Sequence, residues 1–262
     1  MKQVAPLRYG VIFKKAFCDP EIFTAFVRDM IGVTIEIDHV EIEKEFAPPI
    51  GRVQSRSDLF AQDVRNRVIV IILHEHHAYH YDRFMHRHIA ALVEQVANAE
   101  DYRPPMKVFT IVVLTSGDRH KRDVSVTDFA PRDMQGNALR ETPHKVLYLC
   151  PKYVSDDTPE QYREWLLAIR DTLDGEVEET DYHLPEIQKL FDHIEKDSVS
   201  PEERARMFDE HGQELLQDEK FAEGEKQKAI ETARKMKTKG YDTDEIADLT
   251  GLSVEEINAI DD

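Results

Sequence analysis

Residues 68–73 form an unbroken aliphatic run, Val-Ile-Val-Ile-Ile-Leu, and a run of this kind leaves few choices of fold. It is far shorter than the roughly 18 apolar residues of a membrane span, and its β-branched residues favour a strand. A strand that is apolar at every position has both faces covered, as in α/β sheets. A second apolar run lies at residues 107–114, so we expect two buried strands between layers of helices.

The hydrophobic pattern around these runs predicts a mixed-sheet α/β core. Asp19-Pro20 is typical of a helix start and Gly32 of a helix end. The order helix, three strands, helix, strand, then trailing helices does not fit a repetitive βαβ barrel. The predicted strands are residues 34–43, 54–62, 67–74, 107–114, 124–129 and 145–150, and the predicted helices are residues 9–17, 20–30, 79–99, 159–173, 185–196 and 201–239.

The net charge of -18 weighs against a nucleic-acid partner, because phosphate binding is driven by Lys and Arg. The charge is unevenly distributed, however. Residues 1–150 hold 20 basic and 20 acidic residues, whereas residues 151–262 hold 14 basic and 32 acidic ones. A neutral first half with six arginines between positions 52 and 87 can present a local basic face, and charge that simply faces solvent is the alternative.

Several other classes of protein are disfavoured. The first residues lack an apolar signal segment, and no run is long enough to span a membrane. Cys18 and Cys150 have neither metal-site spacing nor a disulfide framework. There is no glycine-rich phosphate loop and no Gly-x-Ser-x-Gly motif. We therefore expect a globular cytoplasmic protein that is not associated with a membrane.

Three regions are expected along the chain: an α/β core at residues 1–155, helices packed on it at 156–200, and an acidic helical extension at 201–262. The extension ends in two short helices across Thr250-Gly251, which is similar to a helix-turn-helix. The second of these helices has no Lys or Arg, so base reading is not expected. Homo-oligomerisation through the long helix at 201–239, or a regulatory role, is the hypothesis for this end of the chain.

The residues that suggest chemistry lie between positions 58 and 77. Asp58 stands in one expected strand, and the next strand, after a predicted hairpin turn at residues 64–66, ends in His-Glu-His-His at 74–77. Metal-dependent cleavage of a phosphodiester needs carboxylates that converge on Mg²⁺. Alternate residues of a strand share a face, so an acid and its i+2 neighbour can point into one site. An Asp at the bend of one hairpin strand, followed by acid-x-Lys/Gln on its partner, is the PD-(D/E)XK pattern.

Over nearly its whole length the chain resembles the bacterial PD-(D/E)XK family of recombination-promoting nucleases and transposases. The similar segments are residues 13–17 (FKKAF), 57–63 (SDLFAQD), 80–84 (HYDRF) and 219–257, which begins EKFAEGEK and ends TGLSVEEI. The resemblance implies a restriction-endonuclease-like fold, DNA as the partner and Mg²⁺ or Mn²⁺ as the cofactor.

The third strand departs from the family's acid-Ile-Gln-His-Glu. On that register Ile71 stands where the second acid belongs and Leu73 where the glutamine belongs, and neither side chain can ligate a metal. A second register takes Glu75 as the acid and His77 as its i+2 partner, about 13 Å further along at roughly 3.3 Å per residue. The spacing favours the first register and an impaired enzyme. The second gives Asp58, Glu75 and His77 as catalytic residues, with Asp58 and Glu75 binding the metal.

Other interpretations stay open beside the endonuclease. A catalytically inactive relative would keep the nuclease fold as a DNA- or protein-binding module. Six histidines between residues 74 and 88 suggest a zinc site, but HExxH fails because residue 78 is Ala, and polar residues on a solvated surface are the simpler explanation. A solvated strand face likewise explains Glu41, Glu43 and Glu45 more simply than a third metal ligand does.

Overall fold

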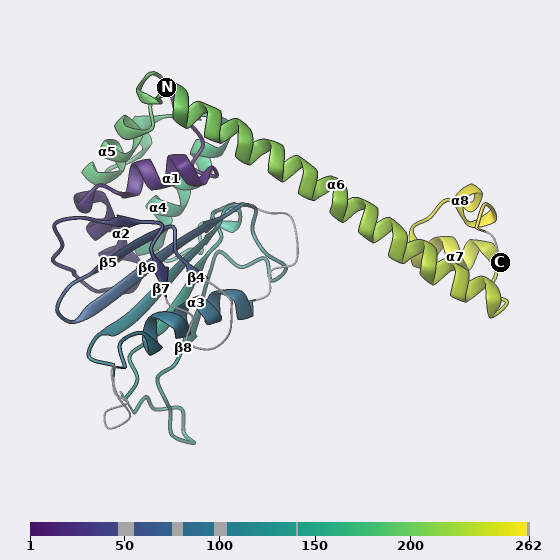
Figure 1. The fold of residues 1–262 in the computed structure, drawn as a ribbon, viewed down its shortest axis with the longest axis horizontal. Helices are drawn as coiled ribbons and strands as arrows, with labels where there is room; N and C mark the ends of the chain where they lie inside the picture. The colour runs from purple at the N-terminus through teal and green to yellow at the C-terminus, as the bar shows by residue number, and fades with distance from the viewer. Residues whose placement is uncertain (47–54, 75–80, 97–103, 140, 261–262) are drawn as a thin grey trace. The chain divides into compact units, whose positions relative to one another are not determined.

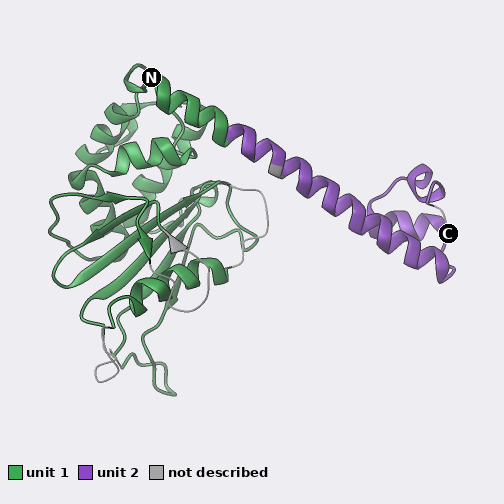
Figure 2. Ribbon diagram, in the orientation of Figure 1, with its two compact units in different colours: residues 1–210 green, residues 211–262 purple. Residues whose placement is uncertain are grey.

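The computed structural model of the chain describes residues 1–46, 55–74, 81–96, 104–139 and 141–260. It divides into two compact units, Met1–Glu210 and His211–Asp262, which Figure 2 shows in green and purple. Each unit has its own hydrophobic core. Among the described residues, no helix is both long and apolar enough to cross a bilayer.

A six-stranded mixed sheet lies at the centre of unit 1, in the order β2-β5-β6-β7-β9-β8 (Figure 1). The strands β6, β7 and β9 run parallel, whereas β2, β5 and β8 join them antiparallel. The prediction of a mixed-sheet α/β core is confirmed. The strands are β2 (Glu41–Ile42), β5 (Leu59–Gln62), β6 (Asn66–Leu73), β7 (Lys107–Leu114), β8 (Val124–Asp128) and β9 (Lys145–Leu149).

Helices flank the sheet on both faces (Figure 1). The first core cluster joins one face to α1, α2, α4 and α5, and the second joins the other face to α3. Val68 and Val70 of β6 belong to the first cluster, while Ile69 and Ile71 belong to the second, so the apolar run is covered on both sides as predicted. These helices are α1 (Gly10–Phe17), α2 (Pro20–Ile31), α3 (Tyr81–Val93), α4 (Glu160–Asp171) and α5 (Pro185–His193).

Local sequence signals fix the ends of these elements. Asp19 caps α2 by accepting a hydrogen bond from the backbone N–H of Glu21 at 2.9 Å, and Gly32 ends the helix in the left-handed conformation at φ 68°. In the β5–β6 hairpin, the Asp63 carboxylate accepts the backbone N–H groups of Arg65 at 2.6 Å and Asn66 at 2.7 Å. The hairpin predicted around residues 64–66 is thus confirmed.

The strand predicted at residues 34–43 is wrong over most of its length. Only its end, β2, pairs with β5, where Glu41 lies opposite Phe60. Continued along the chain, this register brings residue 38 level with Asp63, where the hairpin turns. Residues 34–37 therefore lie beyond the end of β5 and have no neighbouring strand with which to pair. Ile35 is nevertheless buried. The alternation of apolar and polar residues in this segment is the pattern that predicted a strand.

Several other elements end earlier than predicted, and some were not predicted. The helix predicted at residues 79–99 is described from 81, ends at Val93, and is followed by a turn at 94–96; residues 79–80 and 97–99 lie outside the described part. Two pairings between two-residue strands were not predicted, although one of these strands, Ser55–Arg56, falls within the strand predicted at residues 54–62, which is interrupted at residues 57–58. The pairings are β1 (Lys2–Gln3) with β10 (Glu176–Val177) and β3 (Glu45–Phe46) with β4 (Ser55–Arg56); the 3₁₀ turns are η1 (Pro151–Tyr153), η2 (Thr172–Asp174), η3 (Glu179–Asp181) and η4 (Lys196–Ser198).

Unit 2 is helical. The helix α6 (Pro201–Thr238) begins in unit 1, and its C-terminal part packs against α7 (Thr243–Thr250) and α8 (Val254–Asn258). The two short helices predicted across Thr250-Gly251 are confirmed. Gly251 ends α7 at φ 71°, and Ser253 with Glu256 forms a capping box at the start of α8. Their small core consists of Ala233, Ile246, Leu252, Ile257 and Ile260.

Candidate functional site

The β5–β6 hairpin determines the position of Asp58. Leu59 lies opposite Val70, and one further step along this register brings Asp58, at a bend before β5, level with Ile71. The half-buried Asp58 carboxylate accepts the backbone N–H of Ile72 at 2.9 Å through Oδ2. On its other side, the Asp58 carbonyl accepts the N–H of Glu43 at 3.0 Å. Asp58 therefore stands at the bend of a hairpin strand, near the carboxyl end of β6.

Aliphatic side chains occupy the positions where the first register needs an acid and a glutamine. Ile71 is 1% exposed and belongs to the core cluster under α3, which also contains Phe84. Leu73 is half-buried and packs against the same cluster. On this register β6 offers no second carboxylate to a metal. The residues of the second register, Glu75 and His77, lie outside the described residues.

The described residues offer too few ligands for a metal ion. Within the described parts of the chain, no three His, Cys, Asp or Glu side chains are grouped so that they could hold one. Glu43, one candidate third ligand, directs its carboxylate to Lys14 of α1 at 2.7 Å. Glu41 lies 3.4 Å from Lys44. Asp58 alone does not make a metal site. His76 and His80, two of the six histidines considered for the alternative of a zinc site, lie outside the described residues.

The carboxyl ends of the three parallel strands carry polar groups that the sequence patterns did not identify. His74, after β6, shares a hydrogen bond of 2.7 Å with the hydroxyl of Thr115, after β7. The Tyr81 hydroxyl donates to the carboxylate of Asp118, and its ring stacks on Tyr148 of β9 at 4.2 Å between centroids. These contacts join the loop after β7 to the start of α3.

Burial largely determines the protonation of Tyr81 and of Cys150, which directly follows β9. Burial and the Asp118 carboxylate raise the pKa of Tyr81 well above its usual value. Burial, followed by Asp118, raises the pKa of the Cys150 thiol to about 12. Both groups are therefore protonated at neutral pH, so Tyr81 acts as a hydrogen-bond donor. Cys150, at 2% exposure, is a core residue and not a nucleophile.

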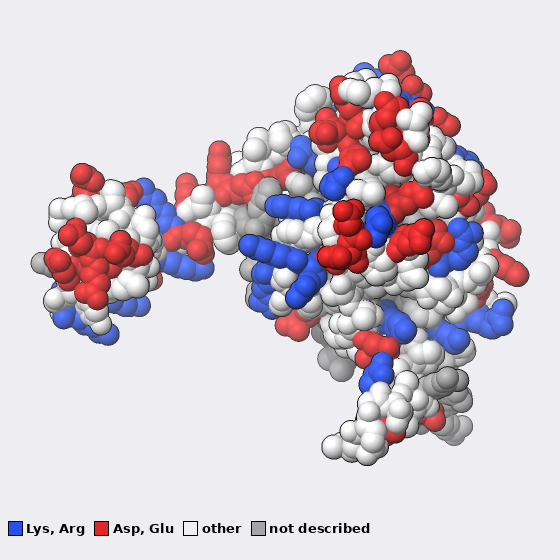
Figure 3. Space-filling model, turned by 180° about the vertical axis from the view of Figure 1, so that it is seen from behind, with Lys and Arg blue, Asp and Glu red and all other residues white. Residues whose placement is uncertain are grey.

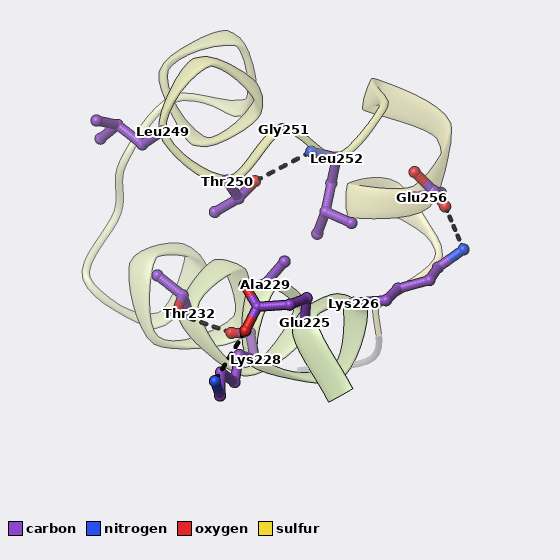
Figure 4. Close-up of a pocket in the computed structure, with 10 residues that line it drawn as sticks. All are labelled: Glu225, Lys226, Lys228, Ala229, Thr232, Leu249, Thr250, Gly251, Leu252 and Glu256. Atoms are coloured by element: carbon purple, nitrogen blue, oxygen red, sulfur yellow. Dashed lines mark hydrogen bonds and ion pairs between the residues drawn. The ribbon is translucent and has the colours of Figure 1, made fainter. Parts of the chain in front are cut away.

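A pocket of about 480 Å³ lies in unit 2 between α6 and the α7–α8 connection (Figure 4). Its four charged side chains pair with one another. Lys226 meets Glu256 at 2.6 Å, and Lys228 meets Glu225 at 2.8 Å. The pocket walls thus neutralise their own charge, and we assign this pocket no ligand.

Comparisons of the chain with protein-family models, with curated proteins and with solved structures find no match. Arguments about function therefore depend on the sequence motifs and on the geometry of the described residues.

Proposed function

We propose that this chain is a metal-dependent DNA endonuclease of the PD-(D/E)XK superfamily that takes part in recombination or transposition. Asp58 and Glu75 are the proposed ligands of Mg²⁺ or Mn²⁺, and His77 is the proposed group that orients water or stabilises charge on the phosphate. A bound divalent cation would activate water and neutralise phosphate charge. The proposed partner is DNA, and the proposed location is the cytoplasm.

One observation carries the proposal. Asp58 stands at the bend of a hairpin strand, level with Ile71 near the carboxyl end of the central strand β6. The chain leaves β6 at this end and continues through His74 toward Glu75 and His77. The PD-(D/E)XK pattern has its first acid at such a bend and its second acid on the neighbouring strand, a role that the proposal gives to Glu75. The mixed sheet with helices on both faces is compatible with a restriction-endonuclease-like core.

A second candidate function is a catalytically inactive module that keeps the nuclease fold to bind DNA or protein. The observation that favours it is the burial of Ile71 level with Asp58, where an active relative needs a carboxylate. The hydrogen bond from the Ile72 N–H also gives Asp58 a structural reason to be present.

A plasmid-nicking assay with Mg²⁺ or Mn²⁺ separates the two candidates. We expect the wild-type chain to nick supercoiled plasmid, and Asp58→Asn and Glu75→Gln each to abolish nicking. Asp82→Asn is the matched control, because Asp82 is an exposed carboxylate on α3 that has no role in the proposal. Absence of metal-dependent nicking by the wild type would reject the endonuclease and support the inactive module.

A gain-of-function variant tests the register of the third strand. If the first register describes the ancestral site, Ile71→Glu combined with Leu73→Gln should create or raise nicking, because it restores the acid and the glutamine. Because Ile71 is buried, circular dichroism must first show that the variant folds. A folded double variant that gains no activity, together with loss of activity in Glu75→Gln, would favour the second register.

A further inference from the structure

The loop after β7 carries a run of exposed basic residues, Arg119-His120-Lys121-Arg122. In the described parts of the chain, no carboxylate forms an ion pair with Arg119, Lys121 or Arg122. By contrast, Arg67, from the arginine-rich stretch noted in the sequence, is engaged by Glu94 at 2.7 Å. On the face drawn in Figure 3, many Lys and Arg residues stand beside Asp and Glu residues.

Asp118 holds the backbone of this loop. Its Oδ1 accepts the backbone N–H groups of His120 at 3.0 Å and Lys121 at 3.1 Å, and its other carboxylate oxygen accepts the Tyr81 hydroxyl. The Asp118 carbonyl accepts the Tyr153 hydroxyl at 3.2 Å. Asp118 is thus used inward. Asp123, the other acid of the loop, accepts the Thr158 hydroxyl at 2.6 Å, and the cationic side chains between the two acids are exposed. Lys121 adopts the left-handed conformation at φ 51°, which is uncommon for a residue with a side chain.

A second strand end contributes to the same surface. Gly117 has φ 81°, and a Cβ atom there would lie 2.6 Å from the ring of Tyr153, so the glycine lets this ring pack against the loop. Tyr153 belongs to η1, directly after β9. Its neighbour Lys152 is exposed and lies 6.0 Å from the centre of the Tyr153 ring. The ends of β7 and β9 therefore present four cations, Arg119, Lys121, Arg122 and Lys152.

These cations lie at the end of the sheet formed by the carboxyl ends of β6, β7 and β9, where Asp58 also stands. Parallel strands all end on the same side of a sheet, and β5 begins on that side because it runs antiparallel to β6. Two strand spacings separate β5 from β7, which is about 10 Å. A distance of about 10 Å along the axis of a DNA duplex corresponds to about three base pairs. Guanidinium groups match phosphate oxygens in pairs, and several separate cations suit a chain of phosphodiesters.

We infer that Arg119, Lys121, Arg122 and Lys152 bind successive phosphates of a DNA strand beside Asp58. This inference deepens the proposed function and rests on it. Asp118, Tyr81 and Tyr153 are positioning residues, because they hold the loop and do not contact the phosphates. The contacts are to the phosphate backbone, so they strengthen DNA binding without reading the base sequence.

Fluorescence anisotropy with a labelled DNA duplex tests the inference on the full chain. The triple variant Arg119→Gln, Lys121→Gln, Arg122→Gln should raise the dissociation constant about tenfold or more at low salt. It should also reduce the slope of log affinity against log salt concentration by roughly 3, because three phosphate contacts are lost. The matched control removes three exposed cations that belong neither to this loop nor to α6 (Lys107→Gln, Arg132→Gln, Lys239→Gln) and should leave both quantities near the wild-type values.

The outcomes separate this inference from the endonuclease. If the triple variant binds DNA as the wild type does, or if the control weakens binding equally, the loop inference is overturned while Asp58-dependent nicking can still stand. If the triple variant loses binding and the wild type never nicks, the inference holds and the endonuclease fails. A wild type that binds vesicles of phosphatidylserine and phosphatidylcholine through the loop, but not DNA, also overturns the inference.

Discussion

Asp58 combines two roles that substitution can separate. Its carboxylate is the proposed metal ligand and also the acceptor for the backbone N–H of Ile72, which is 7% exposed. Asp58→Ala leaves this N–H without its acceptor and should lower the free energy of unfolding by about 1–3 kcal/mol. Asp58→Asn keeps a carbonyl oxygen in place and should lose much less.

Urea unfolding of the two Asp58 variants beside the nicking assay checks this prediction. Under the endonuclease proposal both variants lose nicking, although only Asp58→Ala is clearly destabilised. Equal destabilisation of the two variants would mean that the amide does not replace the carboxylate as acceptor. The loss of nicking could then not be assigned to the metal ligand alone.

His88 makes the stability of unit 1 depend on pH. The side chain lies on the buried face of α3, where Nδ1 shares a hydrogen bond of 2.9 Å with the Thr110 hydroxyl and the ring stacks on Phe129. Burial, and to a lesser degree His144, lowers the pKa of His88 from 6.5 to about 4. Between these two values the unfolded chain binds a proton at His88 that the folded chain does not. The free energy of unfolding therefore falls as the pH drops from about 6.5 toward 4, by up to roughly 3 kcal/mol.

Urea unfolding at pH 7.5 and pH 5.0 measures this effect. We expect His88→Gln to be less stable than the wild type at pH 7.5 but to lose less stability between the two pH values. Part of the dependence will remain, because burial also lowers the pKa of His144, which gives the same sign. An unchanged difference between pH 7.5 and 5.0 in His88→Gln would show that His88 is not the group responsible.

At the scale of elements, the sequence predicts best where burial and turn chemistry agree. The run at 68–73 is apolar on both faces, and β6 has core clusters on both sides. The strand expected at 34–43 was predicted from alternating apolar and polar residues, but this segment runs past the hairpin turn, which only the register of β5 reveals. Two-residue strands such as β1 and β10 depend on pairing between distant parts of the chain, so local periodicity does not predict them.

The candidate site shows the same division. Asp58 could be placed at a hairpin bend, because the pattern that marks it is local. The contact between Tyr81 and Asp118 joins residues 37 positions apart through the parallel pairing of β6 and β7. No spacing rule in the sequence links these residues, so the loop that Asp118 holds could be found only in three dimensions.

Gly117 lies in the β7–β8 loop, and Gly136, in the β8–β9 connection, offers a matched comparison. Gly117 and Gly136 both have positive φ, 81° and 88°, but only at Gly117 would a Cβ meet another side chain, the ring of Tyr153 at 2.6 Å. Gly136→Ala should cost about 1 kcal/mol through its conformation alone. Gly117→Ala should cost about 1–3 kcal/mol more, because Tyr153 must also move.

The difference between the midpoints of thermal unfolding of the two glycine variants isolates the effect of Tyr153. Tyr153→Ala combined with Gly117→Ala serves as the control, because without the ring the extra cost should disappear. If Gly117→Ala is no more damaging than Gly136→Ala, then Tyr153 does not hold the loop against the end of β9.

At the scale of the whole molecule, the 38-residue helix α6 exposes apolar side chains and has opposite charge in its two halves. Leu215 is 51% exposed and Leu216 57% exposed, although both stand on a helix rich in charged residues. Residues 201–219 hold seven acidic and two basic residues, whereas residues 220–238 hold three acidic and six basic ones. Two copies of α6 packed antiparallel would bury the leucines and place each acidic half beside a basic half.

We therefore expect the full chain to self-associate through α6, and Leu215→Glu with Leu216→Glu to shift the sedimentation coefficient toward the monomer. Leu139→Glu is the control, because Leu139 is 53% exposed and belongs to unit 1, in the connection between β8 and β9. Ionic strength tests the direction of packing. At 0.1 M salt, the attraction between exposed charges decays over about 10 Å, and this distance shortens as salt is added. Antiparallel association must therefore weaken between 50 and 500 mM salt. A parallel pair would bring like halves together and tighten instead, so an association constant that rises with salt would exclude the antiparallel arrangement.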